Sequence, residues 1–129
     1  MFEEFASHEF AGTENLRMPY RVLSPKGLAP NQTYPLVLFF HGSGERGNDN
    51  QKQLSHGVER FATAASRSSY PCFLVAPQCP TDLQGRQTMW TGDRERMHER
   101  KLAPEPAAPL RTALELFTCI LKKLPIDRD

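Results

Sequence analysis

The sequence lacks the features that mark several large classes of protein. Its three cysteines, Cys72, Cys79 and Cys119, contain no C-x-x-C pair, so they predict neither a disulfide framework nor a zinc site. We interpret them as reduced, packed thiols. The longest apolar run, residues 36–40, is far shorter than the roughly 18 residues of a membrane-spanning helix. The 16 basic and 15 acidic residues give a net charge of +1, which favours neither nucleic acid nor a membrane as a partner.

The first ten residues contain neither a basic segment nor a continuous apolar one, so they do not resemble a signal peptide. We therefore expect a cytoplasmic protein by default, which leaves a secreted form open. A chain of 129 residues is long enough to build one core but not two, so we expect residues 1–129 to belong to a single domain, of which the resemblance given below makes them the N-terminal portion. Its 11 prolines indicate interrupted elements and long connections.

Two short apolar runs predict buried strands. Residues 36–40 and 72–76 are continuously apolar rather than alternating, which is typical of central parallel strands covered on both faces. Between them, an apolar stripe at helical spacing predicts a helix over residues 58–69, preceded by a polar loop over residues 41–57. Strand, helix and strand together form a βαβ unit.

The remaining segments complete an α/β pattern with a mostly parallel sheet. Residues 5–23 predict a hairpin that turns at residues 12–15. A polar, proline-rich connection covers residues 78–106, and its basic part, residues 86–101, is interpreted as a solvated loop. An amphipathic helix is expected over residues 110–124; its stripe is Leu110, Ala113, Leu114, Phe117, Ile120, Leu121 and Leu124.

A glycine-rich loop follows the first apolar strand and allows three interpretations. Gly42, Gly44 and Gly47 match the G-x-G-x-x-G pattern of dinucleotide-binding sites. That pattern should open a helix, yet about ten polar residues follow Gly47, and Ala76 and Pro77 stand where a ribose-binding acid is expected. The second interpretation is a tight turn without chemistry. The third is an oxyanion hole, in which glycines let main-chain N–H groups come within about 3 Å of a developing negative charge.

The third interpretation rests on a resemblance. The segment His41-Gly42-Ser43-Gly44 resembles the H-G-x-G loop of α/β-hydrolases, which supplies half of the oxyanion hole after the third strand. The longer run HGSGERGNDNQKQLSHG, the strand YPCFLVAPQCP and then Trp90 resemble the esterase and predicted-peptidase branch related to polyhydroxybutyrate depolymerases, feruloyl esterases, dienelactone hydrolases and carboxylesterases.

This resemblance implies roles for particular residues. The N–H of Ser43, with that of Gly44 next, would bind the oxyanion of a small carboxylic ester, while His41 and Gly42 would support the loop. His41 is expected to orient the loop rather than to act as a base. Trp90 would line the substrate cleft or remain a surface aromatic. No metal and no organic cofactor is required.

The G-x-S-x-G motif of a serine nucleophile does not occur in the 129 residues. In the resembled fold the serine follows the fifth strand, so we expect strands 1 to 4 of an incomplete α/β-hydrolase sheet, truncated before the nucleophile strand. Such a fragment should be inactive by itself, with residues 36–40 at an exposed edge that favours self-association. The function expected for the complete protein is that of a serine hydrolase of the phospholipase, carboxylesterase or thioesterase type; the alternative is a non-catalytic relic or interaction module.

Overall fold

The fold is built on a mixed sheet. The computed structural model describes residues 2–92 and 104–129, and its four strands lie in the order β1 (Phe5–Ala11), β2 (Arg17–Leu23), β4 (Phe73–Pro77) and β3 (Leu36–Leu38). The β1–β2 hairpin is antiparallel, β2 pairs antiparallel with β4, and β3 and β4 are parallel. The expected βαβ unit is therefore present. The prediction of a mostly parallel sheet is wrong for the described residues, because β2 runs against both β1 and β4.

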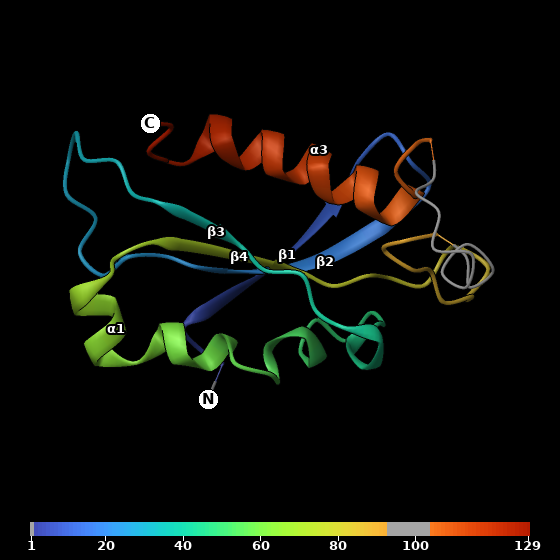
Figure 1. Ribbon diagram of the computed structural model, residues 1–129, viewed down its shortest axis with the longest axis horizontal. Helices are drawn as coiled ribbons and strands as arrows, with labels where there is room; N and C mark the ends of the chain where they lie inside the picture. Colours follow the sequence, from blue (N-terminus) through green and yellow to red (C-terminus); the bar gives the residue numbers. More distant parts are fainter. Residues whose placement is uncertain (1, 93–103) are drawn as a thin grey trace.

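Strand β4 is buried along its whole length because the sheet is covered on both faces (Figure 1). Phe73 and Val75 face helix α3 (Ala108–Lys123) and belong to a core cluster with Leu116 and Ile120. Leu74 and Ala76 point to the opposite face, where the second cluster also contains Phe5, Leu23, Leu54 and Val58. The alternation of side chains along a strand thus explains an unbroken apolar run.

Strand β3 differs from its prediction. It is limited to residues 36–38, its side chains are half-buried, and Phe40 is 37% exposed. In the described part of the chain β4 is its only neighbour within the four-stranded sheet, so β3 is an edge strand, as expected for a sheet truncated before the next strand, and not the central strand that its apolar run alone indicates. Just before β3, the outer edge is paired with the C-terminal segment. The Tyr34 N–H donates to the Pro125 carbonyl at 2.9 Å, and the Tyr34 carbonyl accepts from the Asp127 N–H at 2.8 Å.

The predicted helix over residues 58–69 is divided. A 3-10 helix η3 (Val58–Ala62) is followed by α1 (Ala64–Ser69), with Thr63 in an extended conformation between them. The Thr63 hydroxyl accepts from the Ser66 N–H at 3.1 Å, which caps the second helix and so starts it anew. Two further 3-10 helices, η1 (Ser43–Glu45) and η2 (Lys52–Leu54), lie in the segment that was predicted to be loop.

Helix α3 agrees with its prediction in extent but not fully in its buried face. Leu114, assigned to the apolar stripe, is 45% exposed, whereas Leu116 is 1% exposed and packs under the helix. The sheet-facing residues are Pro109, Thr112, Ala113, Leu116 and Ile120. The buried face of the helix thus includes the polar Thr112, which the apolar pattern does not predict. Thr112 can be buried there because its hydroxyl donates to the Ala108 carbonyl at 2.9 Å, so the helix itself satisfies the polar group.

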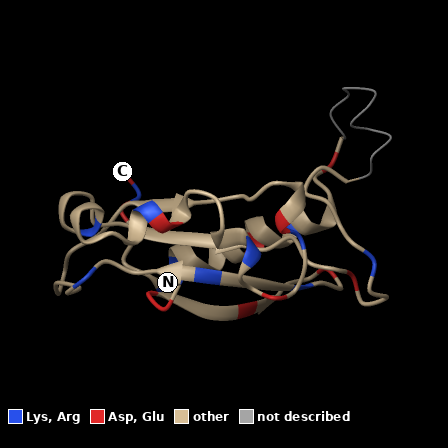
Figure 2. Cartoon of the chain, turned by 90° about the horizontal axis from the view of Figure 1, so that it is seen from below, with Lys and Arg blue, Asp and Glu red and all other residues tan. Residues whose placement is uncertain are grey.

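Charged residues of both signs are distributed along the described chain (Figure 2). None of the described helices has the length and apolar character needed to cross a membrane. Part of the basic stretch at residues 86–101, namely residues 93–101, lies outside the described residues.

Candidate active site

The glycine-rich loop leaves the C-terminal end of β3 and lies against the chain that follows β4. The Phe39 N–H donates to the Val75 carbonyl at 2.9 Å, which extends the parallel ladder beyond β3, and the Gly47 N–H donates to the Cys79 carbonyl at 3.0 Å. The carboxyl ends of parallel strands meet at one edge of a sheet, where ligand sites of α/β proteins are commonly found. The fold therefore places the loop at a position suited to a binding site.

His41 connects the loop that follows β3 to the segment that follows β4. The side chain is 6% exposed, and its Nε2 accepts from the Cys79 N–H at 2.8 Å. Its Nδ1 lies 2.6 Å from the Gly42 carbonyl, so with Nε2 as acceptor the proton is assigned to Nδ1. Burial lowers the pKa of His41, and this favours the neutral ring. Both nitrogens are engaged by main-chain groups, an arrangement that orients the loop and leaves no free nitrogen for a base.

Ser43 and Gly44 form the start of η1 and are exposed. The first N–H groups of a helix have no acceptor within it, and no acceptor among the described residues pairs with the N–H of Ser43 or of Gly44. A Cβ added at Gly44 would meet nothing within 4 Å, whereas one added at Gly42 would lie 3.2 Å from Glu45 Oε2. The turn thus presents two adjacent free donors with little side-chain bulk around them.

The dinucleotide interpretation finds no support in this geometry. Gly42 precedes a 3-10 helix of 3 residues, Gly44 lies within it and Gly47 follows it, and the first α-helix begins only at Ala64. A pyrophosphate site of that type needs the N-terminus of a longer helix directly after the glycines.

A buried amide network, which no local sequence pattern indicates, fixes the far side of the loop. Gln78 is fully buried directly after β4. Its Nε2 donates to the Glu45 carbonyl and to Asp49 Oδ1, both at 2.9 Å, and its Oε1 accepts from the Asn50 N–H at 2.7 Å. One side chain therefore holds three points of the loop to the end of β4. The only sequence signal is a glutamine directly after a buried strand.

Asn50 continues the network toward the hairpin. Its Nδ2 donates to Ser7 Oγ at 2.9 Å and to the carbonyls of His8 and Tyr20, both at 3.2 Å. Its Oδ1 accepts from Gln53 Nε2 at 2.6 Å. The backbone of Asn50 has φ of 54°, in the left-handed region that asparagine tolerates better than most residues. The segment that appeared to be an unstructured polar loop is thus fixed to β1, β2 and β4.

Asp49 shows the electrostatic character of the same loop. Burial acts to raise the pKa of its carboxyl, but the N–H groups of Gln51 and Lys52 and the Gln78 amide donate to it, so the pKa is lowered overall. Glu45 is paired with His56 at 3.2 Å. The carboxylates of Glu45 and Asp49 are thus engaged by other groups of the described chain.

Trp90 is brought to the loop from the connection after β4. Its ring meets Phe40 edge to face with centroids 5.0 Å apart, and the His41 ring lies 5.4 Å away. Thr88 anchors this segment through its hydroxyl, which donates to the Pro80 carbonyl at 2.6 Å and lies 3.4 Å from Cys79 Sγ. Burial raises the pKa of the Cys79 thiol, which disfavours the thiolate. All the residues proposed from sequence, His41, Gly42, Ser43, Gly44 and Trp90, therefore lie in one region.

Among the described residues, no cluster of three or more His, Cys, Asp or Glu side chains is arranged to hold a metal ion.

Comparisons with known proteins bear on the fold. No family model matches the sequence, and no curated protein matches it. Among solved structures, a thermostable esterase matches with a TM-score of 0.82 and 30% sequence identity, over 99% of this chain and 33% of the esterase. The chain thus spans about a third of that protein's length. It has an esterase-like α/β fold, an incomplete α/β-hydrolase sheet with helices on both faces.

Proposed function

We propose that this chain is the N-terminal part of a serine hydrolase that acts on carboxylic esters, and that it supplies the oxyanion-hole loop. The observation that carries the proposal is the pair of free N–H groups of Ser43 and Gly44, held at the C-terminal end of β3 by His41. The likeness to a thermostable esterase supports ester chemistry. The sequence resemblance supports the polyhydroxybutyrate depolymerase and feruloyl esterase branch.

The chemistry follows from these donors. When a serine oxygen adds to an ester carbonyl, the carbonyl oxygen gains a negative charge, and preorganised N–H groups stabilise that charge more than they stabilise the substrate. The Ser43 N–H is the first candidate donor and the Gly44 N–H the second. The neutral His41 ring keeps the turn in place because its two nitrogens are bonded to Cys79 and Gly42.

The proposed nucleophile, its histidine and the acid that orients it lie outside these 129 residues, because no G-x-S-x-G occurs within them. In the complete protein the serine attacks, the histidine transfers its proton to the leaving alcohol, and the acid fixes the histidine. Trp90 would line the acyl or alcohol pocket beside Phe40. Without the nucleophile, the chain alone should be nearly inert, since loss of a triad serine costs about a millionfold in kcat.

The first test is the intact mass of the native polypeptide, together with ester hydrolysis by the 14.6 kDa chain. We expect a larger native protein that hydrolyses nitrophenyl esters, and no hydrolysis by the 14.6 kDa chain. Robust activity of the short chain that is lost on mutating one of its residues would overturn the division of roles. A native mass of 14.6 kDa without activity would replace the enzyme by the alternative, a non-catalytic interaction module or relic.

The second test addresses the N–H of Ser43 in the native hydrolase. Ser43→Pro removes the N–H at the first position of η1, where a proline backbone is compatible with a helix start and follows an extended Gly42. We expect kcat to fall about 100- to 1,000-fold. The matched control Ser43→Ala keeps the N–H and should retain kcat. Equal activities of the two variants would contradict the role of the N–H, and loss of activity in Ser43→Ala would assign the chemistry to the hydroxyl.

A further inference from the structure

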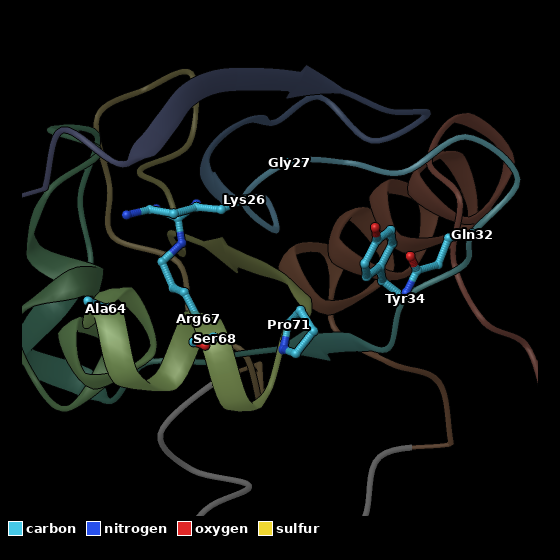
Figure 3. A pocket seen from close by; sticks show the side chains of 8 residues that line it. All are labelled: Lys26, Gly27, Gln32, Tyr34, Ala64, Arg67, Ser68 and Pro71. Carbon is cyan, nitrogen blue, oxygen red and sulfur yellow. The ribbon is translucent and has the colours of Figure 1, made fainter.

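A cavity lies at the end of the sheet opposite the glycine-rich loop. Its volume is about 430 Å³, and it is found where the chain enters β3 and β4; it is lined by Lys26, Gly27, Gln32, Tyr34, Ala64, Arg67, Ser68 and Pro71 (Figure 3). Because β3 and β4 are parallel, their N-terminal ends, beside the cavity, are separated from their C-terminal ends, beside the glycine-rich loop, by the length of a strand, roughly 16 Å for five residues. The cavity is therefore distinct from the candidate active site.

The lining of this cavity contains basic but no acidic side chains. Two of its side chains, Lys26 and Arg67, carry a positive charge. Arg67 rises from α1 toward the loop that carries Lys26 (Figure 3). The Arg67 side chain is 12% exposed; its guanidinium is paired with Glu4, which offsets its charge, and donates to the Ser24 carbonyl at 2.6 Å. Lys26 is exposed and forms no ion pair among the described residues, so its positive charge is not neutralised there.

Neutral donors also line the cavity. The Tyr34 hydroxyl accepts from the Ala29 N–H at 3.1 Å, so its own proton remains available to an acceptor. Ser68 adds a hydroxyl from α1, and Gln32 adds an amide from the other end of the cavity (Figure 3). Positive charge together with uncharged donors favours an oxygen-rich anion over a cation or an apolar molecule.

The loop that carries Lys26 is fixed at both ends. Arg67 holds its beginning through the Ser24 carbonyl, and Tyr34 holds its end through Ala29. Gly27 has φ of +63°, and this left-handed conformation turns the chain beside the cavity without a side chain that would enter it. The site would therefore require little ordering when a ligand binds, and preorganisation of this kind favours affinity.

We propose that this cavity binds a small organic anion through a carboxylate or phosphate group, with Lys26 as the charged contact and Ser68 and Tyr34 as hydrogen-bond donors. The volume lies within the range of about 300 to 1,000 Å³ typical of small-molecule sites. The proposal is independent of the esterase assignment, because it uses other residues at the other end of the sheet.

The test is an NMR titration of the chain with inorganic phosphate and, separately, with acetate, each at ionic strength matched with sodium chloride. We expect saturable shifts of the Gly27, Gln32 and Ser68 amides and none at Gly44. Lys26→Met should raise the Kd about tenfold, since it removes a charge-assisted contact. The exposed Lys123 on α3 provides the control: Lys123→Met should leave the Kd unchanged.

The two anions distinguish the source of the oxyanion. Saturation by phosphate alone assigns the site to phosphate esters, and saturation by acetate assigns it to carboxylates. Equal shifts with sodium chloride, or an unchanged Kd in Lys26→Met, would overturn the proposal.

Discussion

At the scale of the residue, His41 shows how one side chain can fix a loop. Its Nε2 must be unprotonated to accept from the Cys79 N–H, and burial lowers its pKa. In the unfolded chain the same ring has an ordinary pKa of about 6.5. Below that pH the unfolded state binds more protons than the folded one, so folding stability decreases as the pH falls.

This gives a prediction for His41→Gln. Between about pH 7 and pH 5.5 the free energy of unfolding of the wild-type chain should decline, and the variant should show a shallower decline from a lower starting value. Urea unfolding at a series of pH values measures both. His8→Gln, at an exposed position on β1, is the control and should keep the wild-type slope. An unaltered slope in His41→Gln would show that His41 is not the group responsible.

Asn50 makes a second prediction at this scale, because its side chain and its backbone contribute separately. Asn50→Ala removes the side-chain contacts to Ser7, His8, Tyr20 and Gln53. It also leaves an alanine at a φ of 54°, a left-handed conformation that alanine tolerates less well than asparagine. It should cost about 2 to 4 kcal/mol in stability.

Asn50→Gly is the matched variant, since it removes the same contacts without the backbone strain. It should be about 1 kcal/mol more stable than Asn50→Ala in urea unfolding. The opposite order would mean that the positive φ is not maintained in solution.

At the scale of the element, α3 separates buried from apolar positions. Leu116 packs into the cluster beneath the helix at 1% exposure, while Leu114 is 45% exposed. Leu116→Ala should reduce the free energy of unfolding by about 2 to 5 kcal/mol. Leu114→Ala is the same substitution at an exposed leucine two positions earlier, and it should cost less than about 1 kcal/mol. Chemical denaturation of both variants tests the orientation of the helix, and similar costs would place Leu114 in the core.

At the scale of the whole molecule, the outer edge of β3 has open hydrogen-bonding groups. Pro35 and Phe39 bond to β4, so Leu36 and Leu38 direct their main-chain groups away from it, toward the side where Tyr34 pairs with Ile126. Beyond Tyr34, no described strand occupies this edge. An unpaired edge is a template for another strand, so we expect the isolated chain to self-associate.

Leu38→Pro tests this mechanism because it removes an outward N–H and leaves the bonds to β4 intact. Sedimentation velocity over a range of concentrations should show association of the wild-type chain and of the control Leu38→Ala, which loses the side chain but retains the N–H. Leu38→Pro should shift toward the monomer. A wild-type chain that is monomeric at every concentration would contradict the prediction.

The sequence determined by itself which segments form the core and which residues could carry chemistry. The apolar runs at residues 36–40 and 72–76 and the stripe over residues 110–124 are local patterns, and each predicted an element that the structure contains. The loop His41 to Gly44 was identifiable because glycine spacing after a strand is also local.

Only the tertiary structure decided how these segments meet. Strand pairing made the sheet mixed, since hydrogen bonds between strands depend on partners distant in the sequence. The same holds for Gln78 and Asn50, whose amides have no signal until the loop lies against β4 and the hairpin. The contact of Trp90 with His41 and the cavity beside Lys26 also join distant segments, so periodicity and motif spacing could not reveal them.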